Sequence, residues 1–158
     1  MLSGNPDTFA IWCDSVDSWS SGRFKNGCFG YIIGGKLIWS TRSTLTVDLE
    51  MLSRLHCMSH AVEDDNLFRL PVTEAYIELC SRAFPAVDSD VESIDFTHLV
   101  SAESLSDDGY YVFLVESAGQ AKLIYGFKED YDNIIEILLS YGEFQGVVNT
   151  ALQKFTRL

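Results

Sequence analysis

The chain has 158 residues, of which 23 are acidic and 11 are lysine or arginine, so its net charge is −12 with neutral histidines. This acidity argues against nucleic acid as a direct ligand and against an anionic membrane surface, because both need clusters of lysine and arginine. Apolar and aromatic residues are as frequent as in ordinary globular proteins, which excludes a disordered or low-complexity class.

The amino terminus has neither the positively charged region nor the apolar region of a signal peptide. The longest apolar run, residues 110–115, is far too short to span a membrane. We therefore expect a cytoplasmic protein whose scattered cysteines are reduced thiols. These cysteines are Cys13, Cys28, Cys57 and Cys80.

The first quarter of the chain predicts a strand and then a hairpin. Residues 8–19 alternate with a period of two, as a strand does, and residues 29–33 alternate in the same way. Gly34-Gly35 favours a tight primed turn, since both positions tolerate a positive φ. Residues 36–40 form the returning strand, and we expect its Trp39 to lie mostly in the core.

Two helices are predicted next. Residues 48–58 carry leucines along one side, and Asp48 can cap the helix. Residues 71–83 have apolar side chains at i, i+3, i+4 and i+7, and Pro85 ends this helix. The connection between the two helices is a short acidic loop of Glu63, Asp64 and Asp65.

The second half of the chain predicts more strands and then two helices. The expected strands are residues 97–101, 110–117 and 122–128, and the expected helices are residues 130–141 and 144–155. The middle strand is apolar on both faces, as a covered central strand should be. Gly142 is expected to end the first helix. Gly30 and Gly126 lie inside strands, which indicates a bulge or a close helix crossing.

This order of elements predicts the α+β class. We expect a single domain over residues 1–158, because one domain is the simplest arrangement at this length. Its architecture would be a mainly antiparallel β-sheet of about five to six strands with about four helices packed on it.

Negative charge is concentrated in residues 83–121, which contain 8 acidic residues and neither lysine nor arginine. Such a concentration costs self-repulsion and adds nothing to a core. It is either a solvated loop that keeps the protein soluble or a docking surface for a basic partner. Electrostatic complementarity would then favour the right partner and speed association.

Three groups of residues could carry chemistry. His56 and His60 are spaced to share a metal on a helix, but no further pair completes four ligands, and Cys57 would lie off that face. His98 near Asp95 could form a base with its orienting acid, but no nucleophile is evident nearby. The alternating carboxylates of Asp88, Asp90 and Glu92 lack the glycine and glutamate of a calcium loop. We therefore predict no enzyme, no metal and no cofactor.

Four stretches, spread over most of the chain, carry a family resemblance. They are residues 4–11 (GNPDTFAI), 26–31 (NGCFGY), 104–110 (SLSDDGY) and 123–127 (LIYGF). Taken in this order, they resemble the immunity-protein-42 family of bacterial polymorphic-toxin and contact-dependent growth inhibition systems. None of them is a catalytic motif.

The resemblance implies a small cytoplasmic protein that binds and neutralises the C-terminal domain of a cognate toxin. We expect a monomer in a one-to-one complex rather than a homo-oligomer. Its acidic side chains would face a basic cleft on a nucleic-acid-acting toxin and block the active site. Candidate toxin-binding residues, inferred from charge, are Asp88, Asp90, Glu92, Asp95, Glu63, Asp64 and Asp65.

Trp19 is added to these candidates, because tryptophan is a frequent interface anchor and this one lies in a polar stretch. Two alternatives stay open at this point. One is a small metal-dependent enzyme that uses His56 and His60, and the other is an acidic regulatory or scaffold protein without a single basic target.

Overall fold

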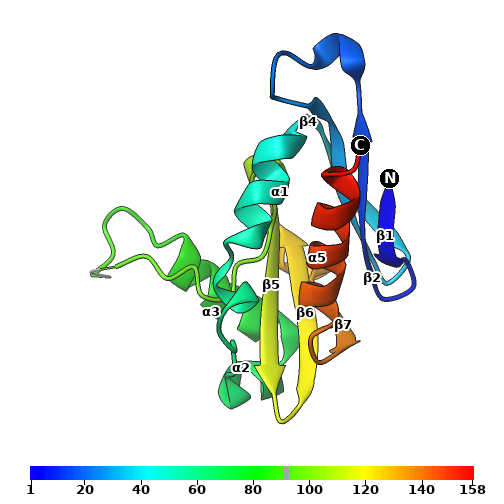
Figure 1. Ribbon diagram of the computed structural model, residues 1–158. Helices are drawn as coiled ribbons and strands as arrows, with labels where there is room; N and C mark the ends of the chain where they lie inside the picture. Colours follow the sequence, from blue (N-terminus) through cyan, green and yellow to red (C-terminus); the bar gives the residue numbers. More distant parts are fainter. Residues whose placement is uncertain (91–92) are drawn as a thin grey trace.

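Two antiparallel sheets organise the computed structural model, which describes residues 1–90 and 93–158 (Figure 1). The first sheet has the strand order β1-β2-β3-β4, and the second has the order β5-β6-β7. The strands are β1 (Leu2–Asn5), β2 (Phe9–Ser15), β3 (Asn26–Ile33), β4 (Lys36–Thr44), β5 (Tyr110–Ser117), β6 (Gln120–Phe127) and β7 (Ile135–Ser140). The α+β class is thus confirmed, although the strands divide between two sheets instead of forming one.

Five α-helices accompany the sheets in the described part of the chain. They are α1 (Leu45–Ser53), α2 (Asp65–Arg69), α3 (Val72–Ala83), α4 (Glu103–Asp107) and α5 (Glu143–Phe155). Three short 3-10 helices lie in the connections: η1 (Asp17–Trp19), η2 (His56–Met58) and η3 (Tyr131–Asn133). No helix in this part of the chain is long and apolar enough to cross a membrane.

The main core lies between the two sheets, together with α1, α4 and α5. Alternate residues of β2 and β3, such as Phe9, Ile11 and Tyr31, point into it and are fully buried. From the second sheet, Val112 and Leu114 of β5 enter the same core. The two-residue period seen in the sequence is therefore confirmed for these strands.

Helices α2 and α3 cover the other face of the second sheet. There, Phe113 and Val115 of β5 pack in a second cluster with Tyr76 and Leu79 of α3 and Leu67 of α2. Strand β5 is thus apolar on both faces, as predicted, because helices cover one face and the main core covers the other. The i, i+3, i+4, i+7 pattern of α3 is confirmed as its buried side.

The hairpin between β3 and β4 is also confirmed. Gly34 and Gly35 have φ values of +57° and +81°, which a primed turn requires. The prediction for Trp39 was wrong, because its side chain is 48% exposed on the outer face of β4. Alternation along this strand places Ile38 inward and therefore sends Trp39 outward.

The first predicted helix begins earlier than expected, at Leu45, and ends at Ser53. Asp48 therefore does not cap it but is buried in its first turn. Its carboxylate accepts hydrogen bonds from the Ser43 hydroxyl and from the backbone N–H and hydroxyl of Ser104. These donors join β4, α1 and α4, which accounts for an aspartate inside the protein.

The predicted helix over residues 130–141 was wrong. Strand β7 occupies half of this stretch and pairs with β6, with Ile137 opposite Leu123. Ile135, Ile137 and Leu139 alternate toward the core, a strand pattern that the sequence also contains. Gly142 has a φ of +82° and lies directly before α5, so it begins that helix and does not end an earlier one.

Residues 97–101 form no assigned strand, but they run beside β5. The backbone N–H of Val100 donates to the carbonyl of Val112, and the N–H of Leu114 donates to the carbonyl of His98, both at 2.8 Å. The predicted strand thus becomes an irregular segment held against an edge of the second sheet. This contact fixes the carboxyl end of residues 84–101 of the connection between α3 and α4, and these residues are called the acidic segment below.

Candidate functional site

The acidic segment leaves the end of α3 and projects from the body of the molecule, at the left in Figure 1. Asp88 and Asp90 lie in this projecting part and are exposed. Neither side chain makes an ion pair or a hydrogen bond within residues 1–90 and 93–158. The predicted contact residue Glu92 lies outside the described residues.

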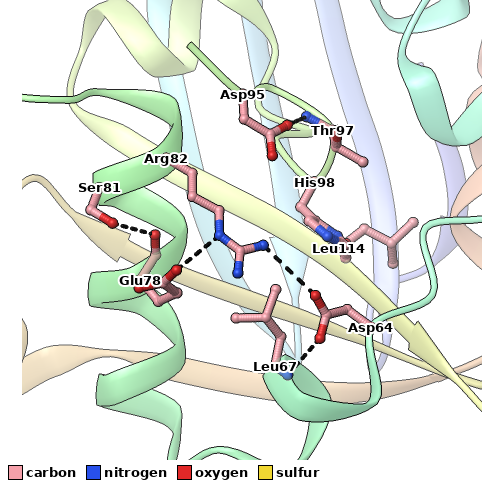
Figure 2. A network of polar contacts seen from close by, with 9 residues as sticks. All are labelled: Asp64, Leu67, Glu78, Ser81, Arg82, Asp95, Thr97, His98 and Leu114. Carbon is pink, nitrogen blue, oxygen red and sulfur yellow. Dashed lines mark hydrogen bonds and ion pairs between the residues drawn. The ribbon is translucent and has the colours of Figure 1, made fainter. Parts of the chain in front are cut away.

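Where the segment returns to the body, Arg82 connects it with the loop before α2 (Figure 2). The Arg82 guanidinium donates to Glu78 at 2.9 Å and lies 3.7 Å from the Asp64 carboxylate. The backbone N–H of Asp95 donates to the Arg82 carbonyl at 2.9 Å. The structure therefore brings the two predicted acidic stretches, around residues 64 and 95, together around one arginine.

Asp95 has a local structural role as well as a charge. Its carboxylate accepts a hydrogen bond from the backbone N–H of Thr97 at 2.9 Å. Hydrogen bonds from the Thr97 side chain and backbone lower the pKa of Asp95, and the nearby charges of His98 and Arg82 lower it further. The carboxylate is therefore held ionised at the surface.

Two of the other acidic candidates also accept hydrogen bonds within the protein. Asp64 caps α2 by accepting from the backbone N–H of Leu67 at 2.9 Å, so the stretch read as a loop is in fact a helix start. Asp65 accepts from the Ser117 hydroxyl. Glu63 is exposed.

His98 is buried, and its Nδ1 atom lies 2.8 Å from the Leu114 carbonyl oxygen. Its ring anchors the acidic segment to β5 (Figure 2). Within the described residues no hydrogen bond joins His98 to Asp95. The two side chains are neighbours, but the arrangement of a base and its orienting acid is not formed.

His56 and His60 stack their rings with centroids 4.5 Å apart at the surface. Cys57 between them is buried, and desolvation raises the pKa of its thiol to about 12, which leaves it unreactive. In the described ranges, 1–90 and 93–158, no three His, Cys, Asp or Glu side chains gather as metal ligands would.

An open groove lies beside the acidic segment, and no sequence pattern predicted it. It has a volume of about 850 Å³ and lies between the end of α1, the end of α3 and residues 93–99. Its apolar lining residues are Met51, Leu55, Phe84, Ile94, Phe96 and Leu99. Ile94 and Phe96 are 58% and 53% exposed. Large apolar side chains inside an acidic segment are the sequence feature that could have predicted this groove.

Trp19 is 51% exposed, so its side chain is accessible at the surface. It belongs to η1, in the blue loop at the top of Figure 1, whereas the acidic segment projects at the left. The structure does not bring Trp19 together with the acidic candidates.

An exposed acidic segment beside an apolar groove is the kind of surface by which one protein binds another. The family of Immunity protein 42 matches residues 1–154, and the chain therefore belongs to this family. It is an immunity protein of the contact-dependent growth inhibition type, which neutralises a toxin.

A solved relative has nearly the same fold. The crystal structure of CdiI from Burkholderia dolosa AUO158 is 65% identical in sequence, with a TM-score of 0.94. The match covers 98% of this chain and 99% of that chain. Among the curated proteins that were compared, none matches.

Proposed function

We propose that this protein inhibits its toxin by forming a one-to-one complex with the toxin's C-terminal domain in the cytoplasm. The protein acts as a monomer and without catalysis, and it covers a basic active site that acts on nucleic acid. Membership of an immunity family supports the inhibitory role. The net charge of −12 supports a basic target, because charge complementarity favours such a pair.

The proposal rests mainly on the exposure and the lack of described intramolecular partners of Asp88 and Asp90. Both are exposed, and neither has an intramolecular partner within the described residues. They also lie in residues 83–121, which contain no lysine or arginine, so no cation of this stretch offsets their charges. Carboxylates that cost self-repulsion and support no local structure are available to a basic partner.

The remaining candidates contribute in different ways. Asp95, Asp64 and Asp65 already accept hydrogen bonds inside the protein. They therefore contribute mainly to the negative electrostatic field and less to direct contacts with the toxin. Glu63 and Glu92 stay in the proposed surface. Trp19 takes part only if the toxin extends as far as η1.

The test is a titration of the immunity protein with the toxin's C-terminal domain over a range of salt concentrations. The acidic variant combines Asp88→Asn, Asp90→Asn, Glu92→Gln and Asp95→Asn. We expect it to bind about tenfold more weakly at low salt and to show a flatter dependence of affinity on salt, since screening no longer removes these attractions.

A matched control removes four exposed charges elsewhere. It combines Asp7→Asn, Asp14→Asn, Asp17→Asn and Asp132→Asn. This variant has the same change in net charge but should keep most of the affinity. Equal losses in both variants would mean that only overall charge matters, and no loss in the acidic variant would place the docking surface elsewhere.

A further inference from the structure

The groove beside the acidic segment leaves large apolar side chains in contact with water. Met51 lies on the α1 side, and Phe84, Ile94 and Phe96 lie on the opposite side. All four are exposed large hydrophobic residues. Contiguous apolar surface of this kind, rimmed by polar groups, marks interaction sites in soluble proteins.

The wall formed by Phe84 and residues 93–99 is held in place by aromatic and backbone contacts. Phe84 stacks on Tyr111 of β5 with ring centroids 4.3 Å apart, and Phe96 meets Phe84 edge to face at 6.3 Å. The backbone N–H of Leu99 donates to the Phe96 carbonyl at 3.2 Å. A groove whose wall is fixed before binding loses little conformational entropy when it is filled.

The charges around the groove favour the binding of a positively charged group. Asp95 and Glu103 belong to its lining, and Asp88 and Asp90 lie further along the same segment. The cation of the lining, Arg54, is already paired with Glu50 one helical turn earlier. The groove therefore presents an apolar interior with a net acidic rim.

We propose that the groove receives a large apolar side chain of the toxin domain, flanked by lysine or arginine. The apolar side chain would lie between Met51 and Phe96, and its basic neighbours would face Asp95 and Glu103. This inference rests on the proposed function and names the part of the toxin that the site recognises. Apolar anchors in a desolvated pocket account for most of the affinity of typical interfaces.

The experiment compares the affinities of two groove variants for the toxin's C-terminal domain with that of the wild-type protein. One variant combines Ile94→Ala with Phe96→Ala, and the other is Met51→Ala on the opposite side of the groove. The double variant should bind about 30-fold more weakly, and Met51→Ala about tenfold more weakly, as expected for residues at an interface centre. High salt should remove little of this difference, because the lost contacts are apolar.

The control combines Leu138→Ala with Leu37→Ala, two exposed apolar residues outside the groove lining. It removes similar side chains and should bind like the wild type. Circular dichroism confirms folding, and Met51→Ala on its own tests the groove if the double variant does not fold.

The outcomes separate this inference from the proposed function. If the wild-type protein does not bind the C-terminal domain, the proposed function fails, and the groove inference fails with it. If the wild type binds and the folded groove variants bind equally well, the groove inference is overturned while the proposed function stands. Equal weakening by the control would likewise overturn the assignment of the groove.

Discussion

Gly126 shows how closely helix α3 approaches the second sheet. A Cβ atom at this position would lie 2.5 Å from the Ile134 side chain and 3.0 Å from the Tyr76 ring of α3. The Tyr76 hydroxyl also donates to the Lys128 carbonyl at 2.6 Å, which fixes the ring over the strand. The predicted close helix crossing is confirmed here, and no room is left for a side chain.

Substituting alanine for Gly126 should therefore destabilise the protein. We expect Gly126→Ala to lower the free energy of unfolding by about 1–3 kcal/mol, the usual cost of overpacking a closely packed site. Urea denaturation followed by tryptophan fluorescence measures this change.

The matched control for this glycine is Gly146, near the start of α5, where an added Cβ atom would meet nothing within 4 Å. Gly146→Ala should raise the free energy of unfolding by about 0.5–1 kcal/mol, because alanine is the better helix former. Similar effects at both positions would show that helix α3 does not crowd Gly126.

At the scale of elements, local patterns predicted those elements whose residues alternate or repeat clearly. Strands β2 to β6 and helices α3 and α5 are of this kind. Helices α2 and α4 span only five residues each, too few to show a helical period. Strand β1 has four residues with only Ser3 buried, so nothing local marked it.

Strand β7 could not be decided locally. Ile134, Ile137 and Leu138 fit a helical spacing, while Ile135, Ile137 and Leu139 fit a strand. Pairing with β6 makes this segment a strand. Because this pairing is a tertiary interaction, the local sequence alone does not show it.

The candidate site, too, was only partly predictable from the sequence. Charge was visible in the sequence, so the acidic residues could be named. The groove needs α1, α3 and the acidic segment to meet, which only the tertiary structure shows.

Helix α2 offers a test at this scale, because its start depends on Asp64. Asp64→Ala removes the oxygen that accepts from Leu67 and should cost about 1 kcal/mol of the free energy of unfolding. Asp64→Asn keeps a capping oxygen and should cost much less, even though it loses the charge that faces Arg82.

Urea denaturation of the two Asp64 variants checks this expectation. An equal loss in both would assign the stability to the ion pair with Arg82 and not to the cap. The same comparison identifies Asp64→Asn as the suitable substitution for binding studies, because it changes the surface charge and leaves the helix start in place.

At the scale of the whole molecule, the net charge of −12 is distributed unevenly. Residues 83–121 carry 8 acidic residues without a lysine or arginine, and part of this stretch projects from the body (Figure 1). A one-sided negative field guides a basic partner toward that side and raises the rate of encounter. The apolar groove at the base of the projection can act only after contact, since dispersion and desolvation are short-ranged.

This separation predicts different kinetic effects for the two parts of the surface. A variant with Asp88→Asn and Asp90→Asn should associate with the toxin domain about two- to tenfold more slowly at low salt, with little change in dissociation. The variant with Ile94→Ala and Phe96→Ala should associate at nearly the normal rate and dissociate about 30-fold faster.

Stopped-flow association and surface-based dissociation measurements separate the two rates. Near 1 M salt, where charges are screened within about 3 Å, the acidic variant should associate as fast as the wild type, and the groove variant should still dissociate faster. If instead Asp88→Asn and Asp90→Asn accelerate dissociation at every salt concentration, these carboxylates lie in the desolvated centre of the interface. The toxin would then be bound by the projecting segment itself, with the groove at the edge of the contact.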